Sequence, residues 1–284
     1  MSTLADSFGD VIRKARLGQR LSPEELAGQA GLTVGLIKDA ESGLWVPGTD
    51  QLYRLAIFLG LDPEKLAAYA LGAYAPIPVD TQDLPYEVHT LAVADESGAP
   101  SNTHLLIYRE SREAMLVDPG AEPERILAWV EGHGARLRFI AVTHGHPEPT
   151  GAMEAVREAT GAQVLFPAGD AFLVSTLRED DWLVAGGEMF PLGPGGIEAR
   201  LTAGHTRGGV SWVVGGSAFV GGALVAGSLG FAQVDFEQLR RAVAGEVLAM
   251  PDRTWLFPGR GPATTVGAER GGNPFFTASA LTRV

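Results

Sequence analysis

The stretch AVTHGHPEPTG, Ala141–Gly151, contains the pattern on which the interpretation of this sequence rests. Two histidines, His144 and His146, stand two residues apart directly after an apolar, β-branched run. Residues at this spacing lie on one side of an extended chain, so two imidazoles can bind one divalent transition metal. The pattern then departs from a complete metal site. Pro147, Glu148 and Pro149 come next, and proline has no side-chain ligand atom.

Composition limits the class of protein. A chain of 284 residues, 45% of them hydrophobic, can form one large domain or two ordinary ones with a sizeable core. No stretch reaches the roughly 18 uninterrupted apolar residues of a membrane span. The start, MSTLADSFGD, lacks the basic and then apolar pattern of a secretion signal. Cysteine is absent, which excludes disulfides, thiolate ligands and cysteine nucleophiles. We therefore expect a globular, cytoplasmic protein with no membrane partner.

The charge distribution argues against a general nucleic-acid binder. The net charge is −12, and a negative protein repels a polyphosphate at long range. Residues 1–75 hold seven lysines and arginines against nine carboxylates, a net charge of −2, which leaves −10 for the remainder. Neither part of the chain is basic.

The first part of the chain, residues 1–71, is predicted to be all-α. Ser22 and Glu25 form a capping box around Pro23, and Gly31 ends the same helix. Apolar residues recur at helical spacing at Phe8, Val11, Ile12, Ala15, Leu52, Leu55, Ala56 and Leu59. Five short helices joined by tight glycine turns are typical of a helix-turn-helix bundle.

A proline-rich linker, residues 72–85, separates this part from a second one, residues 86–284. In the second part, β-rich runs such as HTLAVAD, THLLIYRE and AMLVDPG alternate with helical patterns such as EPERILAWVEG and GAMEAVREATG. This alternation predicts an α/β domain. The chain is therefore expected to have two domains of different fold class.

The bundle resembles the phage-repressor (Cro-type, XRE) helix-turn-helix family over residues 6–70. The matching segments are IRKAR, LSPEELAGQAGLTVGLIKDAESG and the stretch Pro47–Leu61. The resemblance implies that the helix Thr33–Glu41 lies in the major groove of a DNA operator. The residues it would place at DNA are Arg16, Arg20, Thr33, Val34, Gly35 and Lys38.

The groove-facing chemistry of that helix is weak. Val34 and Gly35 cannot form bidentate hydrogen bonds with bases, and Asp39 would repel phosphate. Arg16, Arg20 and Lys38 remain as phosphate contacts. The alternative interpretation is that the bundle now serves dimerisation or docking.

The second part resembles the metallo-β-lactamase fold, in particular its glyoxalase II-like branch. The motifs that carry the resemblance follow in order as NTHLLIYRE with LVDPG, THGHPEPTG, TAGHTRGG, AFVGGALVAG and FPGRGPATTVGAERGGNPF. The resemblance implies an αββα sandwich, with two mixed sheets inside, helices outside and a metal cleft on the loops at one edge.

Carried over residue by residue, the resemblance implies one metal site. Three histidines, His144, His146 and His205, match the ligands of the first site. The positions of the second site and of the bridging aspartate hold Glu148, Pro149, Arg260 and Gly222. We therefore expect one zinc or iron ion per chain, or a remnant that binds none, and no dinuclear centre.

The remaining residues are sufficient for a hydrolase. Three imidazoles leave one position on zinc for water, whose pKa falls to about 7. Glu148 would then act as general base, and Arg260 would hold an anionic group or a developing oxyanion. An iron oxygenase centre would want a carboxylate ligand, for which Glu148 is the nearby candidate. Alternatively, Glu148 and Arg260 form an ion pair within about 3.2 Å that merely fills the vacated site.

Two functions remain open at this point. The first is a transcriptional regulator, in which a homodimer binds an operator and the second domain senses a metal or small metabolite in its cleft. The second is a mononuclear metallohydrolase of a thioester or ester, with the bundle as an assembly module. A scaffold without DNA or chemistry is a third possibility. The sequence favours the regulator, since Gly222 and Pro149 remove catalytic parts whereas the bundle pattern is complete.

Overall fold

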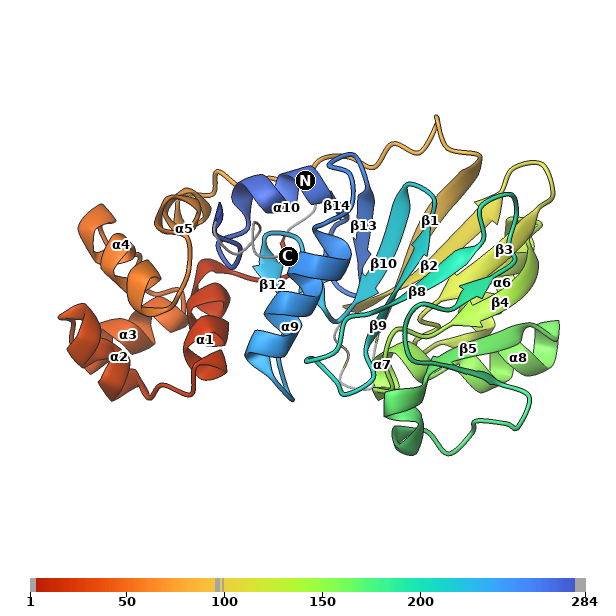
Figure 1. The fold of residues 1–284 in the computed structure, drawn as a ribbon, viewed down its shortest axis with the longest axis horizontal. Coiled ribbons are helices and arrows are strands. Elements are labelled where there is room, and N and C mark those ends of the chain that lie inside the picture. Colours follow the sequence, from red (N-terminus) through yellow and green to blue (C-terminus); the bar gives the residue numbers. More distant parts are fainter. Residues whose placement is uncertain (1–3, 95–97, 99, 279–284) are drawn as a thin grey trace.

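The computed structural model describes residues 4–94, 98 and 100–278. Figure 1 shows an elongated molecule with a helical bundle at one end and a two-sheet sandwich at the other. The bundle consists of α1 (Phe8–Gly18), α2 (Pro23–Ala30), α3 (Val34–Glu41), α4 (Thr49–Phe58) and α5 (Pro63–Ala70). The sandwich begins with β1 at Tyr86, after the five helices.

Local sequence signals set the ends of the bundle helices. Ser22 Oγ accepts a hydrogen bond from the Glu25 amide at 3.1 Å, and the Glu25 carboxylate accepts one from the Ser22 amide at 2.7 Å. The predicted capping box is therefore confirmed. Gly31 ends α2 in the left-handed conformation at φ 65°, which glycine adopts without steric penalty. Thr33 caps α3 by accepting a hydrogen bond from the Leu36 amide at 3.3 Å.

The first sheet has the order β1-β2-β3-β4-β5-β6. Its strands are β1 (Tyr86–Ala94), β2 (Pro100–Tyr108), β3 (Glu113–Val117), β4 (Arg136–Ala141), β5 (Gln163–Pro167) and β6 (Trp182–Val184). The first three are antiparallel, and β3 to β6 are parallel. Two helices, α6 (Pro123–Gly132) and α8 (Met153–Thr160), connect the parallel strands and bury their apolar sides on one face of this sheet.

The second sheet has the order β14-β13-β10-β9-β8-β7. Its strands are β7 (Met189–Phe190), β8 (Ile197–Leu201), β9 (Val210–Val214), β10 (Ser217–Gly221), β13 (Trp255–Pro258) and β14 (Thr264–Thr265). It faces the first sheet across a core that includes Leu106, Met115, Trp212 and Phe219. The predicted sandwich of two mixed sheets is confirmed.

A second set of elements lies between the sandwich and the bundle. These are the hairpin β11 (Leu224–Val225) with β12 (Ser228–Leu229), the helix α9 (Phe236–Ala242) with a following π-helical turn (Val243–Val247), and α10 (Val266–Gly272). In Figure 1 α9 and β12 stand next to α1. One apolar cluster joins the two parts, since Val11 and Ile12 of α1 belong to the same buried core as Leu229 and Phe236. The bundle is therefore docked on the sandwich.

The linker between α5 and β1 is also held to the sandwich. Tyr74 donates a hydrogen bond to the buried carboxylate of Glu269 in α10 and lies 2.9 Å from Thr264 Oγ1. Burial raises the pKa of Glu269.

Among the described residues, no helix is both long enough and apolar enough to cross a membrane.

Arg16 is the one member of the predicted DNA-contacting set that points into the protein. Its side chain is 8% exposed and lies 2.5 Å from the carboxylate of Glu41, while a second nitrogen donates to the Leu21 carbonyl at 2.7 Å. The prediction that Arg16 contacts phosphate is therefore wrong in this conformation, because its guanidinium ties α1 to α3. Arg20, Thr33, Gly35 and Lys38 are exposed, and Val34 packs partly against the core.

Removing this ion pair should destabilise the bundle. Arg16→Ala leaves the nearly buried carboxylate of Glu41 without its cation, and we expect the free energy of unfolding to fall by about 3 kcal/mol. Urea unfolding followed by circular dichroism measures this loss. Lys38→Ala, on the exposed side of α3, is the matched control and should change stability by less than about 0.5 kcal/mol. Equal effects of the two substitutions would contradict a structural role for Arg16.

Candidate metal centre

Three histidines from separate loops converge at one edge of the sandwich. His144 and His146 follow β4, and His205 lies in the loop between β8 and β9. Their ring centroids lie 4.8–4.9 Å apart, with each pair of rings within about 11° of perpendicular. One nitrogen from each ring lies within 4.8 Å of the other two. The predicted set of three imidazoles is therefore brought together around one point.

The nitrogen that His144 offers is fixed by a chain of hydrogen bonds. Asp118 accepts from the Thr143 amide at 2.7 Å and from the Thr143 hydroxyl at 2.8 Å. Because that hydroxyl donates to Asp118, it can only accept from His144 Nδ1, which lies 2.9 Å away. Nε2 of His144 is left unprotonated and free to bind a metal. Burial raises the pKa of Asp118 to about 7.

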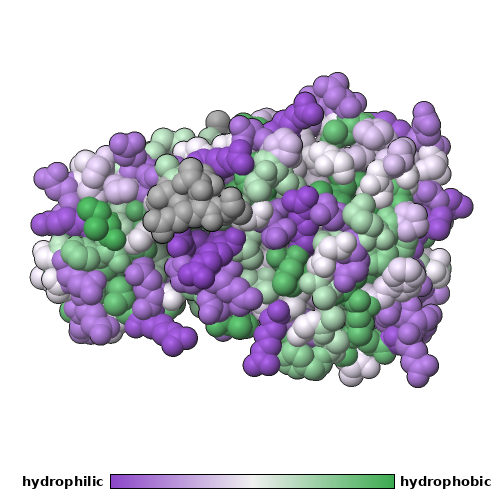
Figure 2. All heavy atoms as spheres, in the orientation of Figure 1, coloured by the Kyte–Doolittle hydropathy of each residue, from purple (hydrophilic) through white to green (hydrophobic). Residues whose placement is uncertain are grey.

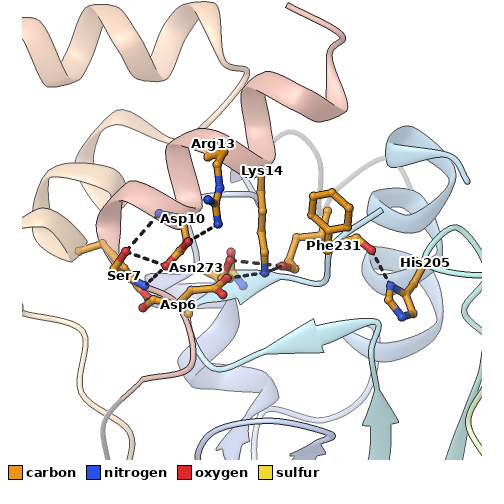
Figure 3. Close-up of polar contacts among 12 residues, drawn as sticks. Asp6, Ser7, Asp10, Arg13, Lys14, His205, Phe231 and Asn273 are labelled. Atoms are coloured by element: carbon orange, nitrogen blue, oxygen red, sulfur yellow. Dashed lines mark hydrogen bonds and ion pairs between the residues drawn. The ribbon is translucent and has the colours of Figure 1, made fainter. Parts of the chain in front are cut away.

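His205 is oriented by the main chain. Its Nδ1 lies 2.5 Å from the carbonyl oxygen of Phe231, as Figure 3 shows, so Nδ1 donates and Nε2 is the metal-facing atom. Burial lowers the pKa of His205, and burial together with His205, His146 and Arg260 lowers the pKa of His144. Both imidazoles are therefore neutral near pH 7, which is the form that binds a metal. The residues present fit one divalent ion with three nitrogen ligands and an open position.

The second metal site of the family pattern is not rebuilt. Among the described residues, the three histidines are the sole cluster of three or more potential metal ligands. A Cβ on Gly222, where the bridging aspartate would stand, would lie 2.6 Å from Cδ2 and 2.7 Å from Nε2 of His205. The ring of His205 thus occupies the space that a side chain at residue 222 would need. Pro149 is buried in the wall of the cleft.

Glu148 and Arg260 lie beside the histidines but not in a tight pair. Arg260 Nη2 and Glu148 Oε1 are 3.6 Å apart, and the two side chains are 46% and 37% exposed. The prediction of a pair within hydrogen-bonding reach is therefore wrong, although the charges remain close enough to attract each other. An exposed pair of this kind contributes little to stability.

The histidines open onto a cleft of about 350 Å³. One wall comes from the sandwich, including Ser101, Phe231 and Gln233. The other wall comes from the bundle and the segment before it, at Ala5, Asp6, Asp10, Arg13 and Lys14. Figure 3 shows Asp10, Arg13 and Lys14 of α1 across from His205 and Phe231. In Figure 2 strongly hydrophilic side chains gather at the junction of the two parts. Sequence reasoning missed the bundle residues, because no local pattern reveals how the bundle docks.

Comparison with known proteins covers the sandwich. The sequence profile of the Metallo-beta-lactamase superfamily matches residues 98–259, a range that contains all three histidines and ends one residue before Arg260. The hydroxyacylglutathione hydrolase GloC of Haemophilus influenzae is 28% identical over 194 residues, 61% of this chain and 92% of that protein. The mitochondrial persulfide dioxygenase ETHE1 of Bos taurus is 32% identical over 191 residues, 62% of this chain and 72% of that protein.

Solved structures agree on the fold. The crystal structure of BLEG-1 B3 metallo-beta-lactamase covers 68% of this chain and 100% of its own, with a TM-score of 0.58 and 25% sequence identity. TTHA1623 in a di-iron-bound form covers 71% of this chain and 100% of its own, with a TM-score of 0.52 and 24% identity. The family match begins after the bundle ends, so the helix-turn-helix assignment stays a prediction.

The contact between Gly222 and His205 makes a specific prediction. Gly222→Ala places a methyl group against the His205 ring, which has to shift away from the other two imidazoles. We expect zinc affinity, measured by competition with a chromogenic chelator, to fall about tenfold or more. Gly28→Ala, where an added Cβ meets nothing within 4 Å, is the control and should leave affinity unchanged. Wild-type affinity in Gly222→Ala would show that His205 does not need this space.

Proposed function

We propose that this chain, which belongs to the metallo-beta-lactamase superfamily, is a mononuclear metal-dependent hydrolase of an ester or thioester. The observation that carries the proposal is the cluster of three imidazoles, each of which brings one nitrogen within 4.8 Å of the other two. Hydrogen bonds at Nδ1 leave Nε2 of His144 and of His205 unprotonated. Among the relatives, the hydroxyacylglutathione hydrolase GloC supports a thioester substrate by its name. The hydrolase interpretation is better supported by these relatives than the regulator interpretation.

Each side chain at the cleft has a role in this proposal. A bound divalent ion would supply Lewis acidity and lower the pKa of a coordinated water. Glu148, half-exposed beside the histidines, accepts a proton at its carboxylate as general base. Arg260 places a fixed positive charge at the cleft, where its guanidinium donates hydrogen bonds to the carbonyl oxygen as negative charge develops there.

The ligand set favours hydrolysis over oxygenation. Iron oxygenases of the non-haem class use two histidines and one carboxylate. Here the third ligand is a histidine, and no carboxylate of the described residues joins the cluster. Glu148 is the nearest candidate, and it lies beside Arg260 at 3.6 Å. Zinc is therefore the proposed ion, with iron as the alternative.

The regulator interpretation rests on the bundle alone. A homodimer that binds a DNA operator would use the exposed Arg20, Thr33, Gly35 and Lys38, but Arg16 is committed to Glu41. Gly35 offers no base-reading group. The bundle also forms a wall of the metal cleft, which gives it a function that does not require DNA.

Hydrolysis by the zinc-loaded full-length protein tests the proposal. We expect turnover of a hydroxyacyl thioester or a nitrophenyl ester that is abolished in His205→Ala. Glu148→Gln removes the base but keeps the shape, and its kcat should fall about 100-fold with KM little changed. Lys38→Ala, on the exposed side of α3, is the control and should match the wild type. Activity no higher than that of His205→Ala with either substrate would refute the proposed function.

A further inference from the structure

The helix α1 is attached to the cleft by more than apolar packing. Lys14 reaches out of α1, and its Nζ donates to the carbonyl oxygen of Leu229 at 2.9 Å. The same ammonium lies 2.5 Å from a carboxylate oxygen of Asp6, and both side chains are 12% exposed. Tyr69 of α5 donates to the Asp6 carbonyl at 2.9 Å, which holds the acidic partner in place. Lys14 is therefore fixed on both sides.

The carbonyl that Lys14 binds belongs to the segment that orients His205. Leu229 pairs with Leu224 in the β11–β12 hairpin, and the next residue, Gly230, donates to the Ala223 carbonyl at 2.9 Å. One residue further on, the carbonyl of Phe231 accepts the hydrogen bond from His205 Nδ1 at 2.5 Å. Only Gly230 thus separates Leu229, which α1 holds, from Phe231, which holds His205.

This segment leaves little room for an alternative arrangement. A Cβ on Gly230 would lie 1.8 Å from the carbonyl oxygen of Gly222, so the main chains approach as closely as glycine permits. A Cβ on Gly222 would in turn lie 2.6 Å from Cδ2 of the His205 ring. The side chain of Phe231 is 45% exposed and does not anchor the segment by burial. The position of its carbonyl therefore depends on how Leu229 and Gly230 are held.

We infer that Lys14 of the helical bundle is a positioning residue for His205, through the segment Leu229–Phe231, so that the bundle is part of the metal centre. The inference rests on the proposed function for the purpose of the site. The contacts that connect Lys14 to His205 do not depend on that function. Figure 3 shows the connection from Lys14 across this segment to Phe231 and His205. Without the ammonium, the segment loses its bond to α1, and the Phe231 carbonyl no longer selects one tautomer of His205.

The chain offers a matched control for Lys14. Lys65 of α5 also reaches from the bundle to main-chain carbonyls of the sandwich part, those of Arg270 and Phe276. These carbonyls lie at α10 and the segment after it, and Lys65 does not line the cleft. A substitution at Lys65 thus weakens docking without touching the segment that holds His205.

Nuclear magnetic resonance of histidine nitrogens in the metal-free, full-length protein tests the inference directly. His205 is assigned by its loss in His205→Gln. In the wild type we expect a single tautomer with the proton on Nδ1, and in Lys14→Met a mixture of both tautomers. Lys65→Met should keep the wild-type spectrum. An unchanged His205 tautomer in Lys14→Met, or the same change in Lys65→Met, would overturn the inference.

Two further variants separate positioning from loss of folding. Lys14→Met leaves Asp6 buried without a partner, so Asp6→Asn/Lys14→Met removes both charges and should still show the mixed tautomers. Lys14→Arg can donate to both Asp6 and Leu229 and should restore the single tautomer. Cobalt affinity should fall about tenfold in Lys14→Met and recover in Lys14→Arg. Failure of the arginine to restore either signal would count against the inference.

The same experiments distinguish the inference from the proposed function. If the His205 tautomer follows Lys14 but no variant or wild-type protein hydrolyses an ester or thioester, the hydrolase proposal fails and the positioning role stands. If hydrolysis depends on His205 while its tautomer is indifferent to Lys14, the hydrolase stands and the positioning role fails.

Discussion

The hydrogen bond from His205 to the carbonyl of Phe231 is the interaction on which the metal centre depends. It turns Nε2 of His205 toward His144 and His146. Without this bond, the main chain would no longer fix which nitrogen of His205 faces the other two histidines. The bond joins a loop of the sandwich to the segment after the β11–β12 hairpin. That segment is held on one side by the hairpin and on the other by Lys14 of the bundle. The site is therefore assembled from both parts of the chain.

The three imidazoles of this site fit one ion, and the positions around them differ from the two-ion pattern that the resemblance implies. Arg260 supplies a positive charge where the family pattern places a metal ligand, and Gly222 makes room for the His205 ring. These two positions act together. The missing carboxylate at residue 222 and the added cation at residue 260 both reduce the negative charge that a second metal ion would need. The remaining ligands keep the neutral imidazoles that one ion requires.

The parts of the structure that local sequence determines were predictable. The Ser22 capping box, the glycine that ends α2 and the His144–His146 pair all depend on residues within a few positions of one another. Arg16 also carried a signal, since it stands four residues after Ile12 and so lies on the buried face of α1. A count of basic residues near the predicted DNA surface does not reveal that orientation.

The docking of the bundle could not be predicted in this way. Lys14 and Leu229 are 215 residues apart, and no local pattern relates them. Their contact depends on the complementary apolar surfaces of α1, β12 and α9, which form one core only after both parts have folded. The motif in the first quoted stretch indicates a metal site, but one wall of its cleft comes from the helical bundle, outside the family match.

Metal content tests the central claim most directly, because the proposed hydrolase requires a bound ion and the positioning of His205 by Lys14 gains its purpose from one. The full-length protein, purified without a polyhistidine tag, is analysed by elemental mass spectrometry beside a His144→Ala/His205→Ala variant. The structure predicts about one zinc or iron per chain in the wild type and none in the variant. A wild-type protein that holds no metal even after incubation with zinc would contradict the account.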